Sequence, residues 1–413
     1  MFGKGAIIAI FGFVLMFSYY QLNLARSITD TVDNYNQQYM ETQLREAVTS
    51  AMNMGVSDVW ENETGSDDWT VVINQCSTRL TITTVNLDTI LVKSKSWTHM
   101  YDPEAGGVTI VADSIMAYFS YRTSVAEYFA FTNDDRGLYW ITGDTLYGRV
   151  HTNTTMNTWG TPVFYGKVTA KNGINPNPVD VKNKALYYGG WEIGVDASVP
   201  SDLTYFETAV TVDNGGAAVN TKSIYDQETY LEFLADGTVK RTVGSDPPDT
   251  VSLAAIAPGG TLWMKKDVHV KGIISGQLTI YSSDDIWIDD DIVYADNPES
   301  NPTSTDMLGL VAKGSVYITD NVPNSSDIYI QASIMTINGT FMAQNYDKRG
   351  ICGDLHLLGS TAQDLAGIMG VFSFKGGLIS GFITKGAYDE RFESVSPPRY
   401  PYVRALKLVS WWE

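Results

Sequence analysis

The chain has 413 residues, with 28 basic and 47 acidic side chains and a formal net charge of −19. Such an acidic chain does not present a broad basic face to a phosphate backbone, so we predict no nucleic-acid partner. Two cysteines, Cys76 and Cys352, are too few for a disulfide scaffold or a four-cysteine zinc site, and we expect both to be free. The hydrophobic content of 44% excludes a disordered chain, and the length suggests two or three domains.

The N-terminal segment is a long apolar run after a short basic start. Residues 6–24 read AIIAIFGFVLMFSYYQLNL and contain no charged side chain. At 1.5 Å per residue this run spans about 28 Å, close to the hydrocarbon core of a bilayer. No small-residue cleavage site closes the run, which favours a retained membrane helix over the alternative, a cleaved secretory signal.

The helical pattern continues beyond the apolar run. Apolar residues recur there at steps of three, four or five among polar ones; they are Ile28, Val32, Tyr35, Tyr39, Leu44, Val48 and Met52. No proline occurs before Pro103, and Gly55 is the predicted stop. Residues 1–55 are therefore predicted to form the anchor segment, with one helix from about Gly5 to near Met54 that is apolar all round in its first half and amphipathic in its second.

This helix resembles the N-terminus of type IV pilins. The start Met1–Gly5 (MFGKG) is similar to a short basic prepilin leader that ends in glycine. The glutamate expected five residues into a mature major pilin is absent, because Ile10 occupies that position, and some minor pilins lack this glutamate too. The resemblance implies that the first half of the helix packs in a membrane or filament core and that the second half packs on a globular head.

The pilin resemblance places assembly on the apolar half of the helix. The candidate residues for helix–helix packing are Ile7, Ile10, Phe13, Val14, Phe17 and Leu24. The implied partners are further copies of the chain or other pilus subunits, with the membrane as the partner before assembly.

A short β-rich segment follows the helix. Residues 56–68 are polar and acidic and are expected to form a loop. The next runs are rich in Val, Ile and Thr and predict strands at 69–73, 80–85, 89–93 and 106–122. Antiparallel strands packed on the amphipathic half of the helix predict a pilin-like α+β head over residues 56–136.

The sequence rhythm changes near residue 137. From there, and most strongly after Gly259, short apolar runs recur between Gly, Asn and Asp. Strands this short suit a parallel β-solenoid, in which each turn stacks on the one before it; a β-sandwich is the alternative. The predicted class is α+β, with a mainly β, solenoid-like domain over residues 137–413 and an insertion at about 172–258.

Three local predictions complete this region. Residues 201–210 start with a serine cap and predict a helix. Strands at 230–233 and 238–242 predict a hairpin with an Asp-Gly turn. The pair Trp411–Trp412 is expected to pack on the last turns of the solenoid and to cap them.

Two stretches, residues 147–169 and 260–296, resemble an uncharacterised bacterial family described as a domain of unknown function, DUF4900. Its members pair a pilin-like hydrophobic N-terminus with a β-rich exported region. Residues 306–312 and the tail 402–412 fit the same pattern. The resemblance implies a structural protein of the cell envelope or extracellular surface, similar to PilX-like minor pilins, and it implies no known reaction.

Catalytic motifs are missing from the sequence. There is no G-x-S-x-G nucleophile motif and no H-E-x-x-H zinc motif. The four histidines are far apart in the sequence. His151 lies in the stretch that resembles the family and is expected to be a structural turn residue. We therefore predict no catalytic residue, no cofactor-binding residue and a chain that is not an enzyme.

An acidic cluster at residues 281–306 has eight carboxylates and no basic side chain. Calcium is the candidate cofactor because it binds several oxygens, with Asp289, Asp291 and Asp296 as weak candidate ligands. Aspartates also cap turns, and solvated turns are the favoured interpretation. The same carboxylates leave a membrane-tethered β-helix carbohydrate-active enzyme as an alternative function. The many tryptophans leave a glycan or surface adhesin as another.

Overall fold

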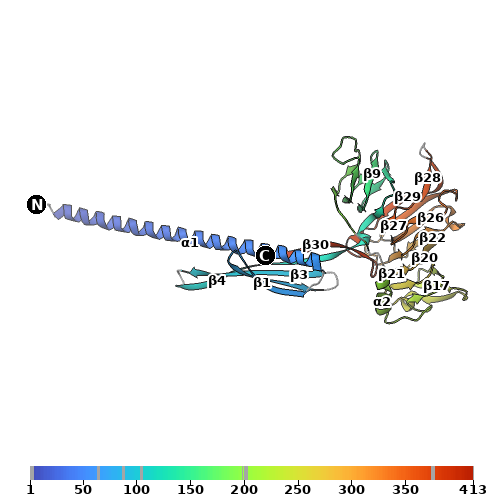
Figure 1. Ribbon diagram of the computed structural model, residues 1–413, viewed down its shortest axis with the longest axis horizontal. Coiled ribbons are helices and arrows are strands. Elements are labelled where there is room, and N and C mark those ends of the chain that lie inside the picture. Colours follow the sequence, from blue (N-terminus) through green and yellow to red (C-terminus); the bar gives the residue numbers. More distant parts are fainter. Residues whose placement is uncertain are drawn as a thin grey trace. The chain divides into compact units, whose positions relative to one another are not determined.

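The computed structural model describes residues 4–62, 66–85, 89–102, 106–197, 199, 203–373 and 377–412. It divides into two compact units. The first unit comprises residues 1–122 and 405–413, and the second comprises residues 123–404. The predicted long N-terminal helix followed by a mainly β region is confirmed (Figure 1).

The first unit combines one helix with one sheet. Helix α1 runs from Lys4 to Asn62. The sheet has five strands in the order β1–β2–β3–β4–β30, of which β1 to β4 form an antiparallel meander. The strands are β1 (Ser66–Ile73), β2 (Cys76–Thr84), β3 (Thr89–Asp102), β4 (Gly107–Ser124) and β30 (Tyr402–Trp412).

The last turns of α1 bury an apolar face against this sheet. The helix contributes Val48, Met52 and Val59 to a core that also contains Leu80 of β2 and Val92 of β3. Ile115, Ala117 and Phe119 of β4 belong to the same core. The expected packing of antiparallel strands on the amphipathic helix is therefore present in the second half of α1.

The helix continues through Gly55, which was expected to end it. A Cβ atom at Gly55 would lie 2.8 Å from Cγ1 of Val92 and 3.0 Å from both Cδ atoms of Leu80. The missing side chain therefore allows α1 to approach the sheet closely, so this glycine serves packing rather than termination. The predicted loop at 56–68 is helical as far as Asn62, and β1 begins at Ser66.

The second unit is built mainly from short parallel strands. Its long ladder has the spatial order β15–β19–β21–β23–β25–β27–β5–β8–β11–β14, with every neighbouring pair parallel. These strands are β15 (Ile224–Tyr225), β19 (Thr261–Met264), β21 (Gln277–Ser282), β23 (Met307–Ala312), β25 (Ile328–Thr336), β27 (Ile351–Leu365), β5 (Tyr128–Asp134), β8 (Arg149–Thr152), β11 (Val168–Ala170) and β14 (Trp191–Ile193).

Further parallel ladders run beside the long one. A second ladder has the order β16–β20–β22–β24–β26, and β22, β25, β27 and β29 are joined in a third. Two small ladders, β6–β9–β12 and β7–β10–β13, flank the β5–β14 end. The strands not yet given are β16 (Thr229–Phe233), β20 (Val268–Ile274), β22 (Ile286–Tyr294), β24 (Val316–Ile318), β26 (Phe341–Ala343), β29 (Leu378–Tyr388), β6 (Tyr139–Ile141), β9 (Thr155–Trp159), β12 (Gly173–Asn175), β7 (Thr145–Leu146), β10 (Val163–Phe164) and β13 (Leu186–Tyr187).

The remaining elements are antiparallel strands and short helices. Strands β17 (Thr238–Val243) and β18 (Asp249–Ser252) extend β16, and β28 (Gly370–Phe372) pairs with β29. The helices are α2 (Thr204–Asp213) and α3 (Leu253–Ile256), with 3-10 turns at Val125–Glu127, Pro323–Ser325 and Glu390–Glu393.

The parallel register places like side chains in columns. Leu262, Ile280, Leu310 and Ile334 follow one another across the long ladder, and all four are fully buried. Parallel strands lie about 4.8 Å apart, so each aliphatic side chain packs on one above and one below it. Each short apolar run of the sequence is thus buried by the equivalent runs of the strands above and below it.

The opposite face of the long ladder is buried as well. Phe206 of α2 stacks on Tyr281 with ring centroids 4.7 Å apart. Tyr400 covers Gly309, where a Cβ atom would lie 2.7 Å from the tyrosine ring. Strands that are buried on both faces need continuous apolar sequences, as Met307–Ala312 (MLGLVA) shows.

The local predictions have mixed outcomes. The Asp-Gly hairpin is confirmed, with β16 and β17 antiparallel and φ of +78° at Gly237. Helix α2 begins at Thr204 with no side-chain cap, while Ser201 lies outside the described residues. Strands β12 to β14 and β16 join the parallel ladders, although they lie in the predicted insertion. Trp411 and Trp412 belong to β30 of the first unit, so the expected solenoid cap is wrong.

The close approach at Gly55 generates a prediction for stability. Gly55→Leu places a side chain against Val92 and Leu80, and overpacking of this kind costs about 1–3 kcal/mol. Hydrogen exchange of the full chain in detergent should show faster exchange in β2 and β3. The matched control is Ser57→Leu, at an exposed position two residues further along α1. Equal protection in the two variants would contradict the close-packing role of Gly55.

Candidate assembly surface

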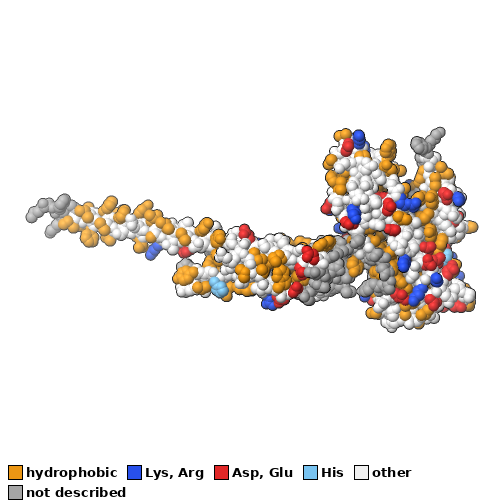
Figure 2. Space-filling model, viewed as in Figure 1, with side chains coloured by type: hydrophobic (Ala, Val, Ile, Leu, Met, Phe, Trp, Pro, Cys, Tyr) orange, Lys and Arg blue, Asp and Glu red, His pale blue; other side chains and the backbone are white. Residues whose placement is uncertain are grey.

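The first half of α1 presents an apolar surface that the rest of the chain does not cover. Every residue from Ile7 to Leu24 is exposed. Figure 2 shows the hydrophobic side chains along this end of the helix, with few charges among them. In the described residues, α1 is long and apolar enough to cross a membrane. Water is a poor solvent for such a surface, so it requires lipid or protein around it.

All six predicted assembly residues lie on this surface. Their exposed fractions run from 49% at Leu24 to 73% at Phe13. At 100° per residue the six positions fall within an arc of about 120°, so their side chains share one broad face of the helix. Their role in helix–helix packing stays a prediction, which the exposure of all six makes physically reasonable.

A second exposed apolar group continues the surface. Ile28, Val32, Tyr35 and Tyr39 lie at steps of four, three and four, with exposed fractions between 50% and 68%. At 100° per residue these steps keep the four side chains on one face of the helix. We call these four residues the α1 stripe.

The α1 stripe lies on nearly the opposite side of the helix from the face that packs on the sheet. The sheet-facing residues begin with Leu44, five residues after Tyr39. A step of five residues turns the helix through about 500°, so Leu44 points about 140° around the helix axis from Tyr39. The sequence pattern treated Ile28 through Met52 as one head-packing face, and the structure corrects this. The five-residue step was the signal that separates the two faces.

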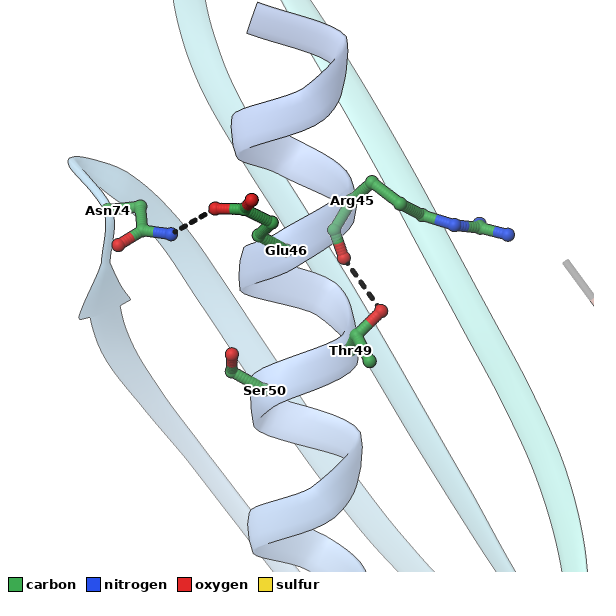
Figure 3. Close-up of a pocket in the computed structure, with 5 residues that line it drawn as sticks. All are labelled: Arg45, Glu46, Thr49, Ser50 and Asn74. Atoms are coloured by element: carbon green, nitrogen blue, oxygen red, sulfur yellow. Dashed lines mark hydrogen bonds between the residues drawn. The ribbon is translucent and has the colours of Figure 1, made fainter.

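A shallow depression lies where α1 passes the turn between β1 and β2. Its volume is about 320 Å³, and Arg45, Glu46, Thr49, Ser50 and Asn74 line it (Figure 3). Asn74 donates a hydrogen bond from Nδ2 to Oε2 of Glu46 at 3.3 Å, and the Thr49 hydroxyl donates to the Arg45 carbonyl at 2.8 Å. Arg45 also lies 3.4 Å from Asp113. The Asn74–Glu46 bond links the β1–β2 turn to the helix, the Arg45–Asp113 pair links the helix to β4, and the Thr49 bond lies within α1.

The aspartates of the second unit cap the backbone of adjacent turns. Oδ1 of Asp267 accepts from the backbone N–H of Asp285 at 3.1 Å, and Oδ1 of Asp285 accepts from that of Ser315 at 2.7 Å. Oδ1 of Asp291 accepts from the N–H of Tyr329 at 2.8 Å. Each carboxylate therefore ties one turn to the next, which agrees with the turn-capping interpretation of the acidic cluster.

The three weak calcium candidates have separate partners. Asp289 lies 2.9 Å from Nδ1 of His269 and accepts from the Thr319 hydroxyl at 2.6 Å. Asp296 accepts from Nδ2 of Asn301 at 2.8 Å. Asp289, Asp291 and Asp296 therefore each serve a different local contact, and their calcium role stays a prediction.

Another acidic group brings three carboxylates close together. In the described part of the chain, one oxygen each from Asp267, Asp284 and Asp285 lies within 4.8 Å of the others. Burial raises the pKa of Asp285, and the hydrogen bond from Ser315 opposes this shift. Asp267 and Asp285 also serve as backbone caps, so two members of this group have a structural task.

His151 is a buried strand residue on β8. Its Nδ1 lies 2.7 Å from the Thr169 hydroxyl, and its Nε2 lies 2.9 Å from Oδ1 of Asn153. Burial lowers the pKa of His151 from its ordinary value of 6.5. His151 therefore has a structural role, but within strand β8 and not in the expected turn, and its side chain joins β8 to the neighbouring strand β11.

Comparisons with known proteins give three findings. The family described as "Domain of unknown function (DUF4900)" matches residues 107–172. This confirms the resemblance for the stretch 147–169, while 260–296 lies outside the match. None of the curated protein sequences compared with the chain matches it.

A solved structure is also similar to the chain. It is the crystal structure of the competence-associated pilin ComZ from Thermus thermophilus. The similarity covers 90% of this chain and 97% of that one, with 11% identical residues and a TM-score of 0.33.

The environment of His151 predicts a pH dependence. The unfolded chain takes up a proton near pH 6.5, and the folded chain does so only at lower pH. The unfolded state therefore binds more protons below pH 6.5, so His151 makes the second unit less stable as the pH falls through that range. Denaturant unfolding between pH 7.5 and 5 should show a shallower loss of stability in His151→Gln. His99→Gln, in the first unit, is the control, and equal pH slopes in both variants would refute this role.

Proposed function

We propose that the chain is a structural, non-catalytic subunit of the pilin type at the cell envelope. Its α1 helix inserts in the membrane and then packs into the core of an extracellular filament, while the acidic β-rich part faces solvent. The observation that carries the proposal is the exposed apolar surface of α1 from Ile7 to Leu24. The DUF4900 match adds a family context without a known reaction.

The length of the apolar surface favours helix packing over simple anchoring. From Ile7 to Tyr39 the helix extends about 48 Å at 1.5 Å per residue. A bilayer core is about 30 Å thick, so lipid covers only part of this length. The α1 stripe beyond Leu24 lies between polar residues and needs a partner with a matching apolar stripe. Another copy of α1 supplies one.

The packing of the second half of α1 on the sheet also supports this role. Leu44, Val48 and Met52 are buried against the sheet, which fixes the folded first unit to the end of the helix. The helix is thus held at one end and uncovered at the other. A rigid helix of this kind can transmit the packing of its apolar half to the folded part that it carries.

We further propose that the second unit is a β-solenoid that serves as the displayed part of the subunit. Its parallel ladders and stacked aliphatic columns support this architecture. No cofactor is part of the proposed role, and the backbone hydrogen bonds of Asp267, Asp285 and Asp291 support a turn-capping use of these carboxylates. The proposal places the acidic charge at the solvent-facing surface, where it favours solubility.

Removing the apolar half tests the proposed function directly. Deletion of residues 6–24 should give a chain that stays in the supernatant without detergent and forms no multimers, because the uncovered surface is gone. Sedimentation and electron microscopy measure both properties. Circular dichroism provides the control that the β content is retained. A deleted chain that still forms filaments would overturn the proposal.

The α1 stripe has a separate test. Substituting Ile28, Val32 and Tyr35 together with serine should leave membrane insertion intact, since residues 6–24 are unchanged. Multimer formation should fall at least ~tenfold, because burial of each large apolar side chain contributes about 1.5–3 kcal/mol and 1.4 kcal/mol is a factor of ten. Cross-linking in membranes measures the multimers.

The matched control for the stripe carries serine at Asn34, Gln37 and Gln38, which are exposed polar residues of the same helix segment. It should assemble like the unaltered chain. Equal assembly of the stripe variant and this control would show that the α1 stripe is not a helix–helix surface.

A further inference from the structure

Strand β30 is an apolar strand at the edge of the five-stranded sheet. Its residues Leu408, Val409, Trp411 and Trp412 have exposed fractions between 50% and 58%. Successive side chains of a strand point to opposite faces, so both faces of β30 carry exposed apolar groups. Among the described strands, β30 stands at the end of the sheet order, next to β4.

The position of α1 explains this exposure. The helix packs on β1, β2 and β3, and its core reaches only as far as Ile115, Ala117 and Phe119 of β4. Trp412 meets Tyr118 edge-on, with ring centroids 5.5 Å apart, yet half of its surface stays exposed. A long apolar edge strand is a template for pairing with another strand.

The opposite edge of the same sheet is formed by β1. In the described residues β1 has β2 as its neighbour and no strand on its other side. It exposes Val72 and carries Asp67 and Asp68, of which Asp68 is paired with Arg79. Asp67 is exposed and leaves negative charge at this edge.

The charges of the two edges are complementary. Lys407 of β30 is exposed. It lies on the same face of the strand as Val409 and Trp411, which is the face opposite Trp412. Trp412 shares the face of Tyr118, which points away from α1 because Ala117 and Phe119 point toward it. Lys407 therefore lies on the α1 side. Asp67 lies on that side too, since it shares a strand face with Trp69, two residues further along, and Trp69 packs against the α1 core.

We propose that β30 of one copy pairs with β1 of a second copy and continues the sheet from subunit to subunit. Main-chain hydrogen bonds hold the two edges together, the exposed side chains of β30 gain cover, and Lys407 approaches Asp67. This contact rests on the proposed function, because it adds a second interface to subunits already gathered by α1.

The choice of a second copy as the partner follows from the two edges themselves. Pairing between different edges of one sheet is heterologous and leaves a free β30 and a free β1 after each addition, so it continues without limit. Pairing of β30 with another β30 ends at a dimer and brings like charges together. An open-ended contact is the kind that a filament subunit needs.

Cysteine cross-linking of the full chain in membranes tests the contact. Thr70 of β1 and Leu408 of β30 both lie on the face away from α1, by the alternation given above. Mixing Thr70→Cys with Leu408→Cys should give dimers with a flexible bis-maleimide, and one chain with both substitutions should give a series of multimers. The unaltered chain is the control, because Cys76 and Cys352 are buried.

Hydrogen exchange supplies a second measurement that does not depend on the register of the pairing. Amides of β1 and β30 should exchange at least ~tenfold more slowly in assembled than in detergent-dispersed chains, with smaller change in β2 and β3. Unchanged exchange in β1 and β30, or dimers from Leu408→Cys alone as abundant as from the mixture, would overturn the edge pairing.

Sedimentation of the same samples separates this proposal from the proposed function. Assembled chains with neither cross-links nor slower exchange would refute the edge contact and leave assembly through α1 intact. Chains that fail to sediment as multimers and give no cross-links would refute both.

Discussion

The apolar surface of α1 is the constraint on which the interpretation of the whole molecule depends. Burial of a large apolar side chain contributes about 1.5–3 kcal/mol, so a dozen exposed ones together represent about 18–36 kcal/mol, more than the roughly 5–15 kcal/mol that stabilises a folded domain. Both units fold without covering this surface. The favourable burial must come from lipid or from other chains, and this makes α1 the functional element.

One turn of α1 separates two kinds of contact. Up to Tyr39 the large apolar residues face outward, and from there on Leu44, Val48, Met52 and Val59 face the sheet of the same chain. The five-residue step between them reorients the apolar face without bending the helix. The helix therefore offers one face to its own sheet and another to a partner. Gly55 strengthens the first contact by allowing the helix to lie close to β2 and β3.

The sequence predicts those features that depend on local pattern. The apolar run 6–24, the strands and the Asp-Gly turn follow from composition and spacing, and with them most of the candidate assembly surface. The packing role of Gly55, the place of Trp411 in β30 and the backbone caps of Asp267 and Asp285 depend on residues distant in the chain. A capping aspartate and its partner are 18 residues apart at Asp267 and 30 at Asp285, a variable spacing that no local motif encodes.

The chain order of the strands imposes a further condition on folding. Strand β5 opens the second unit, yet in the long ladder it lies between β8 and β27, which follows more than 200 residues later. One edge of the β5–β14 segment therefore stays unpaired until β27 is in place. Strand β30 likewise adds to the first unit from the far end of the sequence. Because both units receive a strand from the last part of the chain, neither sheet is complete until that part has folded.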